Sequence, residues 1–181
     1  NTGAALNDLY YYRNLDPDNN EELNFQYATQ NTIVAQPIPG CEKALVSATQ
    51  NTPWDSYIGL AAVGPNFRVA YGGFSNRDAS DIWNGVAGLQ GVQGSTNLAD
   101  EAIALAYKVS TLAAGASETF QFGVILDQNQ IDAALASFYF FDYSGGGGTP
   151  TFCVPVVDTV YTCAGIPTTI SVDGPNTGGY N

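Results

Sequence analysis

The stretch EAIALAYKVSTL (residues 101–112) decides the fold class, because it must be either a helix or a strand. Its three alanines favour a helix. Its large apolar residues, however, recur at every second position: Ile103, Leu105, Tyr107 and Val109. On a strand these four side chains would share one face, whereas on a helix they would scatter around the axis. The period of two therefore predicts a strand with one buried face.

Other stretches carry the same signal. Alternation or a continuous run of β-favouring residues predicts strands at residues 9–15, 23–36, 57–63, 67–74 and 118–126. Only residues 127–138 have helical spacing, with Asp127 as the expected N-cap, and residues 85–97 form a glycine-rich loop. Many short strands with one helix predict an all-β fold, an antiparallel β-sandwich with one short helix.

A change in composition divides the chain near its C-terminal end. Four consecutive glycines at 145–148 are typical of a flexible linker. We therefore predict a β-sandwich domain over residues 1–143, a linker over 144–150, and a strand-forming segment over 151–181. That last segment is too short to bury a core of its own. It would either pack back onto the sandwich or begin a following domain.

Composition and charge exclude several functions. Seventeen acidic residues against five basic ones give a net charge of −12, so the chain lacks the basic surface that nucleic acids and anionic membranes require. It has no histidine, which removes Ser-His-Asp and Cys-His catalysis and the usual zinc ligands. We expect no enzymatic activity. Few lysines, no methionine and abundant Asn, Thr, Gly and Tyr are typical of extracellular proteins.

The acidic stretch DPDNNEE is the best candidate for a metal site. Asp16, Asp18 and Asn20 have the alternating spacing by which loop side chains converge on Ca²⁺, and Glu21 or Glu22 could complete the ligand set. We take Asp16, Asp18, Asn20 and Glu22 as the expected ligands. The alternative is a solvated turn stabilised by local Asp and Asn hydrogen bonds.

A second candidate site lies in SNRDASDIWNG (residues 75–85). Asp78 and Asp81 could bind sugar hydroxyls while the ring of Trp83 covers a sugar face, and Trp54 and Asp55 could line the same patch. The alternative is a capping turn, with Trp83 anchoring the loop on the core and Arg77 paired to Asp78.

Three cysteines, Cys41, Cys153 and Cys163, allow three disulfide pairings. A Cys153–Cys163 bond would close a short loop and contribute roughly 2–3 kcal/mol of stability. A Cys41–Cys153 bond would instead tie the linker to the sandwich. We favour the Cys41–Cys153 bond, with Cys163 pairing elsewhere or remaining free.

The last stretch, CAGIPTTISVDGPNTGGYN (residues 163–181), resembles the opening of the Ig-like or PKD-like repeats in large surface proteins of the Bacteroidota, including gliding adhesins. Residues 13–20, 67–85 and 110–127 look like parts of a β-sandwich module of such proteins. The resemblance implies type IX secretion and a place in a long modular protein or filament. It also implies that residues 151–181 begin an Ig-like domain, with Cys163 bonded beyond residue 181. The tripeptide DTV resembles an O-glycosylation acceptor, which would modify Thr159.

These observations predict a non-enzymatic extracellular module with a structural or adhesive function on the cell surface. Its expected partners are neighbouring domains, surface glycans, or copies of itself that accept residues 151–181 as an added strand. The alternative function is a carbohydrate-binding module that uses Trp83, Asp78 and Asp81.

Overall fold

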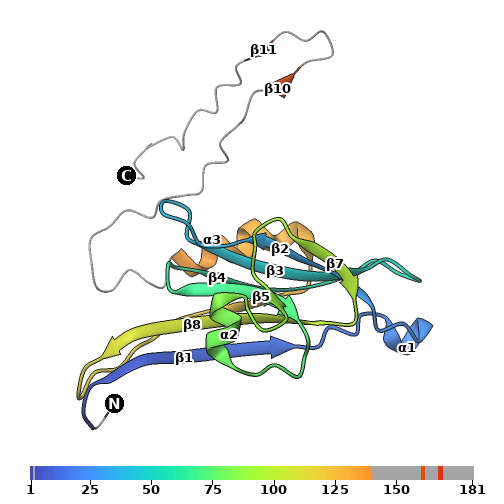
Figure 1. The fold of residues 1–181 in the computed structure, drawn as a ribbon. Coiled ribbons are helices and arrows are strands. Elements are labelled where there is room, and N and C mark those ends of the chain that lie inside the picture. Colours follow the sequence, from blue (N-terminus) through green and yellow to red (C-terminus); the bar gives the residue numbers. More distant parts are fainter. Residues whose placement is uncertain (2, 140–159, 162–166, 169–181) are drawn as a thin grey trace.

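A computed structural model describes residues 1, 3–139, 160–161 and 167–168. Its elements are β1 (Leu6–Leu15), α1 (Glu21–Asn24), β2 (Thr29–Ala35), β3 (Lys43–Gln50), β4 (Ser56–Val63), β5 (Phe67–Gly72), α2 (Ala79–Asn84), β6 (Leu89–Gln90), β7 (Thr96–Ala99), β8 (Ala102–Leu112), β9 (Gly123–Ile125), the 3₁₀ turn η1 (Gln128–Gln130), α3 (Ile131–Tyr139), β10 (Val160–Tyr161) and β11 (Pro167–Thr168). Antiparallel strands in two main sheets dominate (Figure 1). The prediction of an all-β, sandwich-like fold is confirmed.

One main sheet has four strands in the order β1-β8-β5-β6, and the other has five in the order β7-β2-β3-β4-β9. In the first, Tyr11 of β1 lies opposite Tyr107 of β8, which in turn lies opposite Phe67 of β5. The predicted face of residues 101–112 is confirmed, because every second residue of β8 points into the space between the sheets.

The main core fills that space. It comprises buried residues from both sheets: Ile33, Ala44, Val46, Ala48, Leu60, Ala62, Phe67, Val69, Tyr71, Ile103, Leu105 and Tyr107. Each side chain alternates along its strand with one on the outer face, which is the pattern of two sheets packed face to face. Burial of these side chains stabilises the sandwich at roughly 25 cal/mol for each Å² removed from water.

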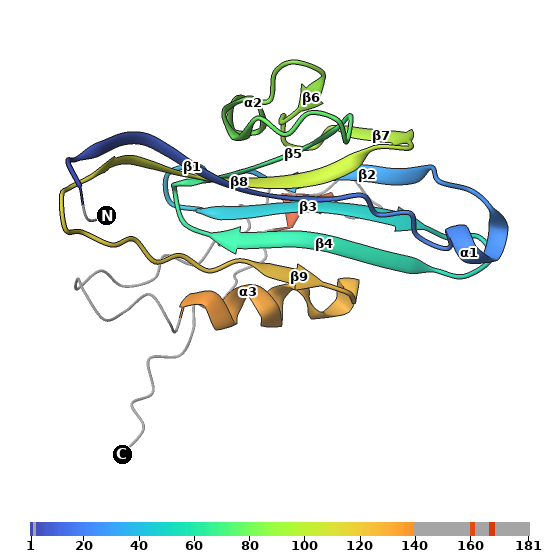
Figure 2. The ribbon, with the colours of Figure 1, turned by 90° about the horizontal axis from the view of Figure 1, so that it is seen from below.

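Each outer face is partly covered by a helix, and the two helices lie on opposite sides of the sandwich (Figure 2). Ile82 of α2 is fully buried against Ala70, Ala104 and Ala106 of the four-stranded sheet. Leu135 of α3 packs in the same way on the five-stranded sheet. The small alanines on the first sheet leave the room that α2 needs.

The predicted strand at residues 23–36 is correct only for Thr29–Ala35. Its first two residues end the short helix α1, which is flanked by Asn20 and Phe25 in the left-handed backbone region. The side-chain oxygen of Asn24 accepts a hydrogen bond from the backbone N–H of Gln26. Such local bonds from asparagine compete with strand pairing and override the apolar alternation.

The predicted strand at residues 118–126 is also too long, because only Gly123–Ile125 pairs with β4. The preceding rings still pack inward: Phe120 stacks on Tyr107 with their centroids 4.3 Å apart. Strand β3 was not predicted, because KALVSATQ is rich in small residues with weak strand preference. It is nevertheless the central strand of its sheet.

The predicted helix at residues 127–138 is confirmed as η1 followed by α3, and the Asp127 carboxylate accepts a hydrogen bond from the backbone N–H of Asn129. The expectation of a single helix is wrong, since α1 and α2 are also present. The predicted loop at 85–97 contains β6 and the first residues of β7. Each of these four elements, α1, α2, β6 and β7, is too short to show a periodic pattern.

Near the C-terminal end, β10 pairs antiparallel with β11, Val160 opposite Thr168. The predicted linker at 144–150 lies outside the described residues, so the domain boundaries remain a prediction.

Candidate functional site

Two loops are joined at one end of the sandwich, where α1 and the β3–β4 hairpin lie side by side (Figures 1 and 2). The amide nitrogen of Asn20 donates hydrogen bonds to the carbonyl oxygens of Trp54 at 2.6 Å and Thr52 at 3.3 Å. The Asn24 amide donates to Thr52 and to the side-chain oxygen of Gln50. We call this region, residues 16–28 with 51–55, the loop end.

The loop end exposes four large apolar side chains. The exposed fractions are 79% for Phe25, 69% for Trp54, 58% for Leu23 and 50% for Tyr27. Single exposed apolar residues are ordinary, but several on two joined loops mark a contact surface. Sequence reasoning missed this group because it assigned Leu23, Phe25 and Tyr27 to a strand and placed Trp54 with the residues around Trp83.

The carboxylates of Asp16, Asp18 and Asp100 converge beside these loops, with one oxygen of each within 4.8 Å of the others. Burial, followed by the charges of Asp18 and Asp100, raises the pKa of Asp16. Three such oxygens are suitable Ca²⁺ ligands.

This trio only partly matches the expected metal ligands. Asp16 and Asp18 do come together, but Asn20 directs its amide nitrogen at the β3–β4 hairpin, and Glu22 is not among the converging carboxylates. Asp100 was not predicted, because it lies far along the sequence in the turn between β7 and β8. Its position just before β8 is the signal that could have found it, since β8 pairs with the strand that ends before Asp16.

We predict that Ca²⁺ added to the chelated protein raises its melting temperature by about 5–10 °C at a concentration ~100 times Kd. The raised pKa of Asp16 gives the reason: stability is lost as the pH rises through that pKa, because the ionised Asp16 is partly removed from water and is repelled by the charges of Asp18 and Asp100. A cation offsets this repulsion. Thermal unfolding followed by circular dichroism measures the shift.

Two variants separate the trio from the ligands expected from sequence. Asp100→Asn should abolish the calcium response, and Glu22→Gln should retain it. The calcium hypothesis is wrong if the wild-type melting temperature is unchanged by calcium.

At the second candidate site, at α2, both carboxylates make local hydrogen bonds, and sugar binding there stays a prediction. The Asp78 carboxylate caps α2 by accepting hydrogen bonds from the backbone N–H groups of Ser80 and Asp81. Together with the Ser80 hydroxyl, these bonds lower the pKa of Asp78. Asp81 accepts a hydrogen bond from the amide of Asn76 at 3.0 Å. Both carboxylates therefore stabilise the turn.

Trp83 is half-buried on the outer face of the four-stranded sheet. The Arg68 guanidinium lies 4.9 Å from the centre of its ring, and the ring of Tyr10 packs edge-on against it at 6.4 Å. Burial lowers the pKa of Arg68. These contacts favour the alternative stated above, in which Trp83 anchors the turn on the sandwich.

Cys41 pairs with Ile38 in an isolated antiparallel bridge just before β3. Its expected partner Cys153, together with Cys163 and the proposed glycosylation residue Thr159, lies outside the described residues. The Cys41–Cys153 pairing and the modification therefore remain predictions.

The chain matches no family model, no curated protein and no solved structure. Among the described residues, no helix is both long and apolar enough to cross a membrane.

Proposed function

We propose that the chain is a non-enzymatic, extracellular adhesive module of a larger cell-surface protein or filament. The observation that carries this proposal is the loop end, where Leu23, Phe25, Tyr27 and Trp54 are exposed on two loops. The fold supports it as well, because a sandwich holds such loops on a rigid scaffold and leaves them accessible.

The arrangement of the loop end suits adhesion to a surface. Aromatic side chains dominate the binding energy of protein contacts, because they remove a large apolar area from water at small entropic cost. The hydrogen bonds from Asn20 and Asn24 hold the loops in place before contact. The neighbouring trio of Asp16, Asp18 and Asp100 offers a place where Ca²⁺ could join this contact.

We predict that the double variant Phe25→Ser/Trp54→Ser lowers adhesion at least about tenfold, since aromatic contact residues often contribute 2 kcal/mol or more. Beads coated with the chain are passed under shear over cellulose, chitin and alkyl-coated surfaces, and the retained fraction is counted. The matched control is Leu6→Ser/Ile38→Ser. It changes two exposed apolar residues remote from the loop end, Leu6 at the start of β1 and Ile38 beyond the end of β2.

Two results would contradict this function. If wild-type beads are retained on none of the surfaces, or equally with both double variants, the loop end is not adhesive. Release of reducing sugar ends from the polysaccharides would show that the chain is an enzyme.

A further inference from the structure

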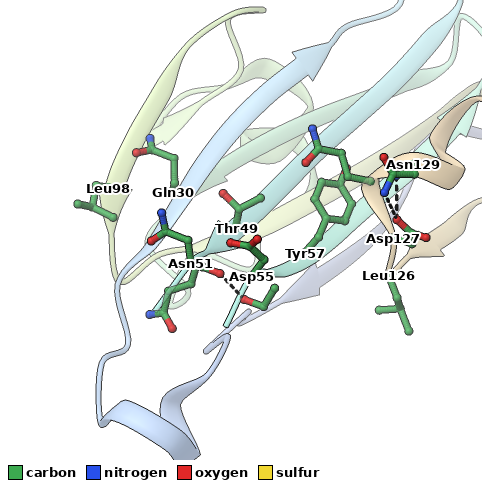
Figure 3. A pocket seen from close by; sticks show the side chains of 12 residues that line it. Gln30, Thr49, Asn51, Asp55, Tyr57, Leu98, Leu126, Asp127 and Asn129 are labelled. Carbon is green, nitrogen blue, oxygen red and sulfur yellow. Dashed lines mark hydrogen bonds between the residues drawn. The ribbon is translucent and has the colours of Figure 1, made fainter. Parts of the chain in front are cut away.

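A groove of about 710 Å³ lies on the outer face of the five-stranded sheet, between β7, the β3–β4 hairpin and residues 126–129, which lead through η1 into α3 (Figure 3). Its volume is in the range of small-molecule binding sites. It is separate from both α2 and the acidic trio.

The side chain of Tyr57 lines the groove and also packs against the apolar cluster that includes Leu135 of α3. Its ring lies over Gly59: a Cβ placed on Gly59 would be 2.9 Å from the Tyr57 hydroxyl and 3.2 Å from the Cε1 atom. The missing side chain at Gly59 therefore lets the ring pack along the sheet, where it lines the groove. Leu98 and Leu126 stand at the sides and are 67% and 71% exposed.

Polar side chains lie on both sides of Tyr57, Asn51 and Asp55 on one side and Asp127 and Asn129 on the other (Figure 3). The hairpin contributes Asn51 and Asp55, and η1 contributes Gln128. Within the described part of the chain, the Asp55 carboxylate, the Gln128 amide and the Asn51 amide nitrogen make no hydrogen bond to protein. Gln50 differs, because its amide is fully used in holding residues 24, 26 and 28. The groove therefore offers both donors and acceptors to a ligand.

The charge of the groove limits the class of ligand. Its lining includes the carboxylates of Asp55 and Asp127 and neither lysine nor arginine, so an anionic ligand would be repelled. A carboxylate and amides pair with vicinal hydroxyls, and an aromatic ring covers the apolar face of a sugar. A neutral sugar chain presents both kinds of surface at once.

We propose that this groove binds a neutral oligosaccharide, with Tyr57 under the sugar ring and Asn51, Asp55 and Gln128 binding its hydroxyls. This inference goes beyond the adhesive function, because it assigns a ligand class to a groove whose lining includes none of the exposed aromatic residues, although groove and loop end share the loop 51–55. It shares Asp55 with the sugar patch expected from the sequence, but it includes none of Asp78, Asp81 and Trp83.

The test is calorimetric titration of the full chain with soluble hexasaccharides of β-1,4-glucose, α-1,4-glucose, β-1,4-xylose and β-1,4-mannose. Hexagalacturonate serves as the anionic comparison, and a lysine-rich hexapeptide as the cationic one. We expect at least one neutral hexasaccharide to bind with a sub-millimolar Kd and hexagalacturonate to bind at least tenfold more weakly. Binding of the lysine-rich peptide alone would overturn the proposal in favour of a basic peptide ligand.

Variants locate the bound sugar. Asn51→Ala and Asp55→Ala should each weaken binding about tenfold, and Leu126→Arg should obstruct the groove. All three positions are exposed, so the variants should fold. The matched control Asn66→Ala removes an exposed asparagine beyond the other end of β4 and should leave the Kd unchanged. The proposal is overturned if no neutral sugar binds, or if Trp83→Ala weakens binding while the groove variants do not. Because Leu126 lies outside the loop end, Leu126→Arg can abolish sugar binding while bead adhesion is retained, so the two proposals can fail independently.

Discussion

Replacing Gly72 with alanine is expected to destabilise the protein by about 3 kcal/mol, because a side chain at this position collides with backbone. A Cβ on Gly72 would lie 2.5 Å from the carbonyl oxygen of Gly88 and 3.0 Å from the Cα of Leu89. Neither atom can move by rotating a side chain. Strand β6 would have to separate from β5, where Tyr71 pairs with Gln90 and Gly72 with Leu89.

Urea unfolding measures this loss directly, and the adjacent glycine supplies the control. A Cβ on Gly73 would come no closer than 4.0 Å, to the flexible hydroxyl of Ser75. Gly73→Ala should therefore change the free energy of unfolding by less than about 0.5 kcal/mol. Equal effects of the two variants would show that the close approach of β6 to β5 does not constrain the fold.

Truncating Ile82 to alanine is expected to cost about 2–5 kcal/mol. Ile82 is the one fully buried residue of α2, and it packs against Ala70, Ala104 and Ala106. Those alanines have no side-chain length with which to fill the space that Ile82 would leave. The cost should therefore include a cavity as well as lost apolar burial.

The control for this variant is Val86→Ala, just beyond α2, where the side chain is 47% exposed. It should cost under about 0.5 kcal/mol in the same urea experiment. A loss at Ile82 no larger than that at Val86 would mean that α2 is not held on the sheet by this contact. The same protein samples would show whether Trp83 stays packed, since its fluorescence shifts when the indole meets water.

The fold class could be predicted from the sequence because the alternation in β8 and β5 is direct evidence of one buried face. Strand β3 could not, since three of its eight residues are alanine or serine, whose burial depends on neighbours far along the chain. At the first loop, asparagine hydrogen bonds to the β3–β4 hairpin replaced the expected strand. Such long-range bonds leave no local pattern.

The candidate sites were likewise predictable only where their residues lie close together in the sequence. Asp16 and Asp18 were predictable from their spacing, but Asp100 is brought to them by the pairing of β1 with β8. Asp78, Asp81 and Trp83 were identified as a group, and the structure shows them engaged in capping and packing around α2. The groove could not be predicted, because its lining comes from five separate segments of the chain.

The side-chain hydrogen bonds by which Asn20 and Asn24 join the first loop to the β3–β4 hairpin affect the affinity of any contact made there. Ordering a loop on binding costs conformational entropy, which subtracts from affinity. Asn20 and Asn24 impose that order in the free protein, so the cost is met during folding. A partner of the loop end would thus meet a nearly rigid surface, and complex formation would resemble the docking of two preshaped bodies more than the folding of a loop around its target.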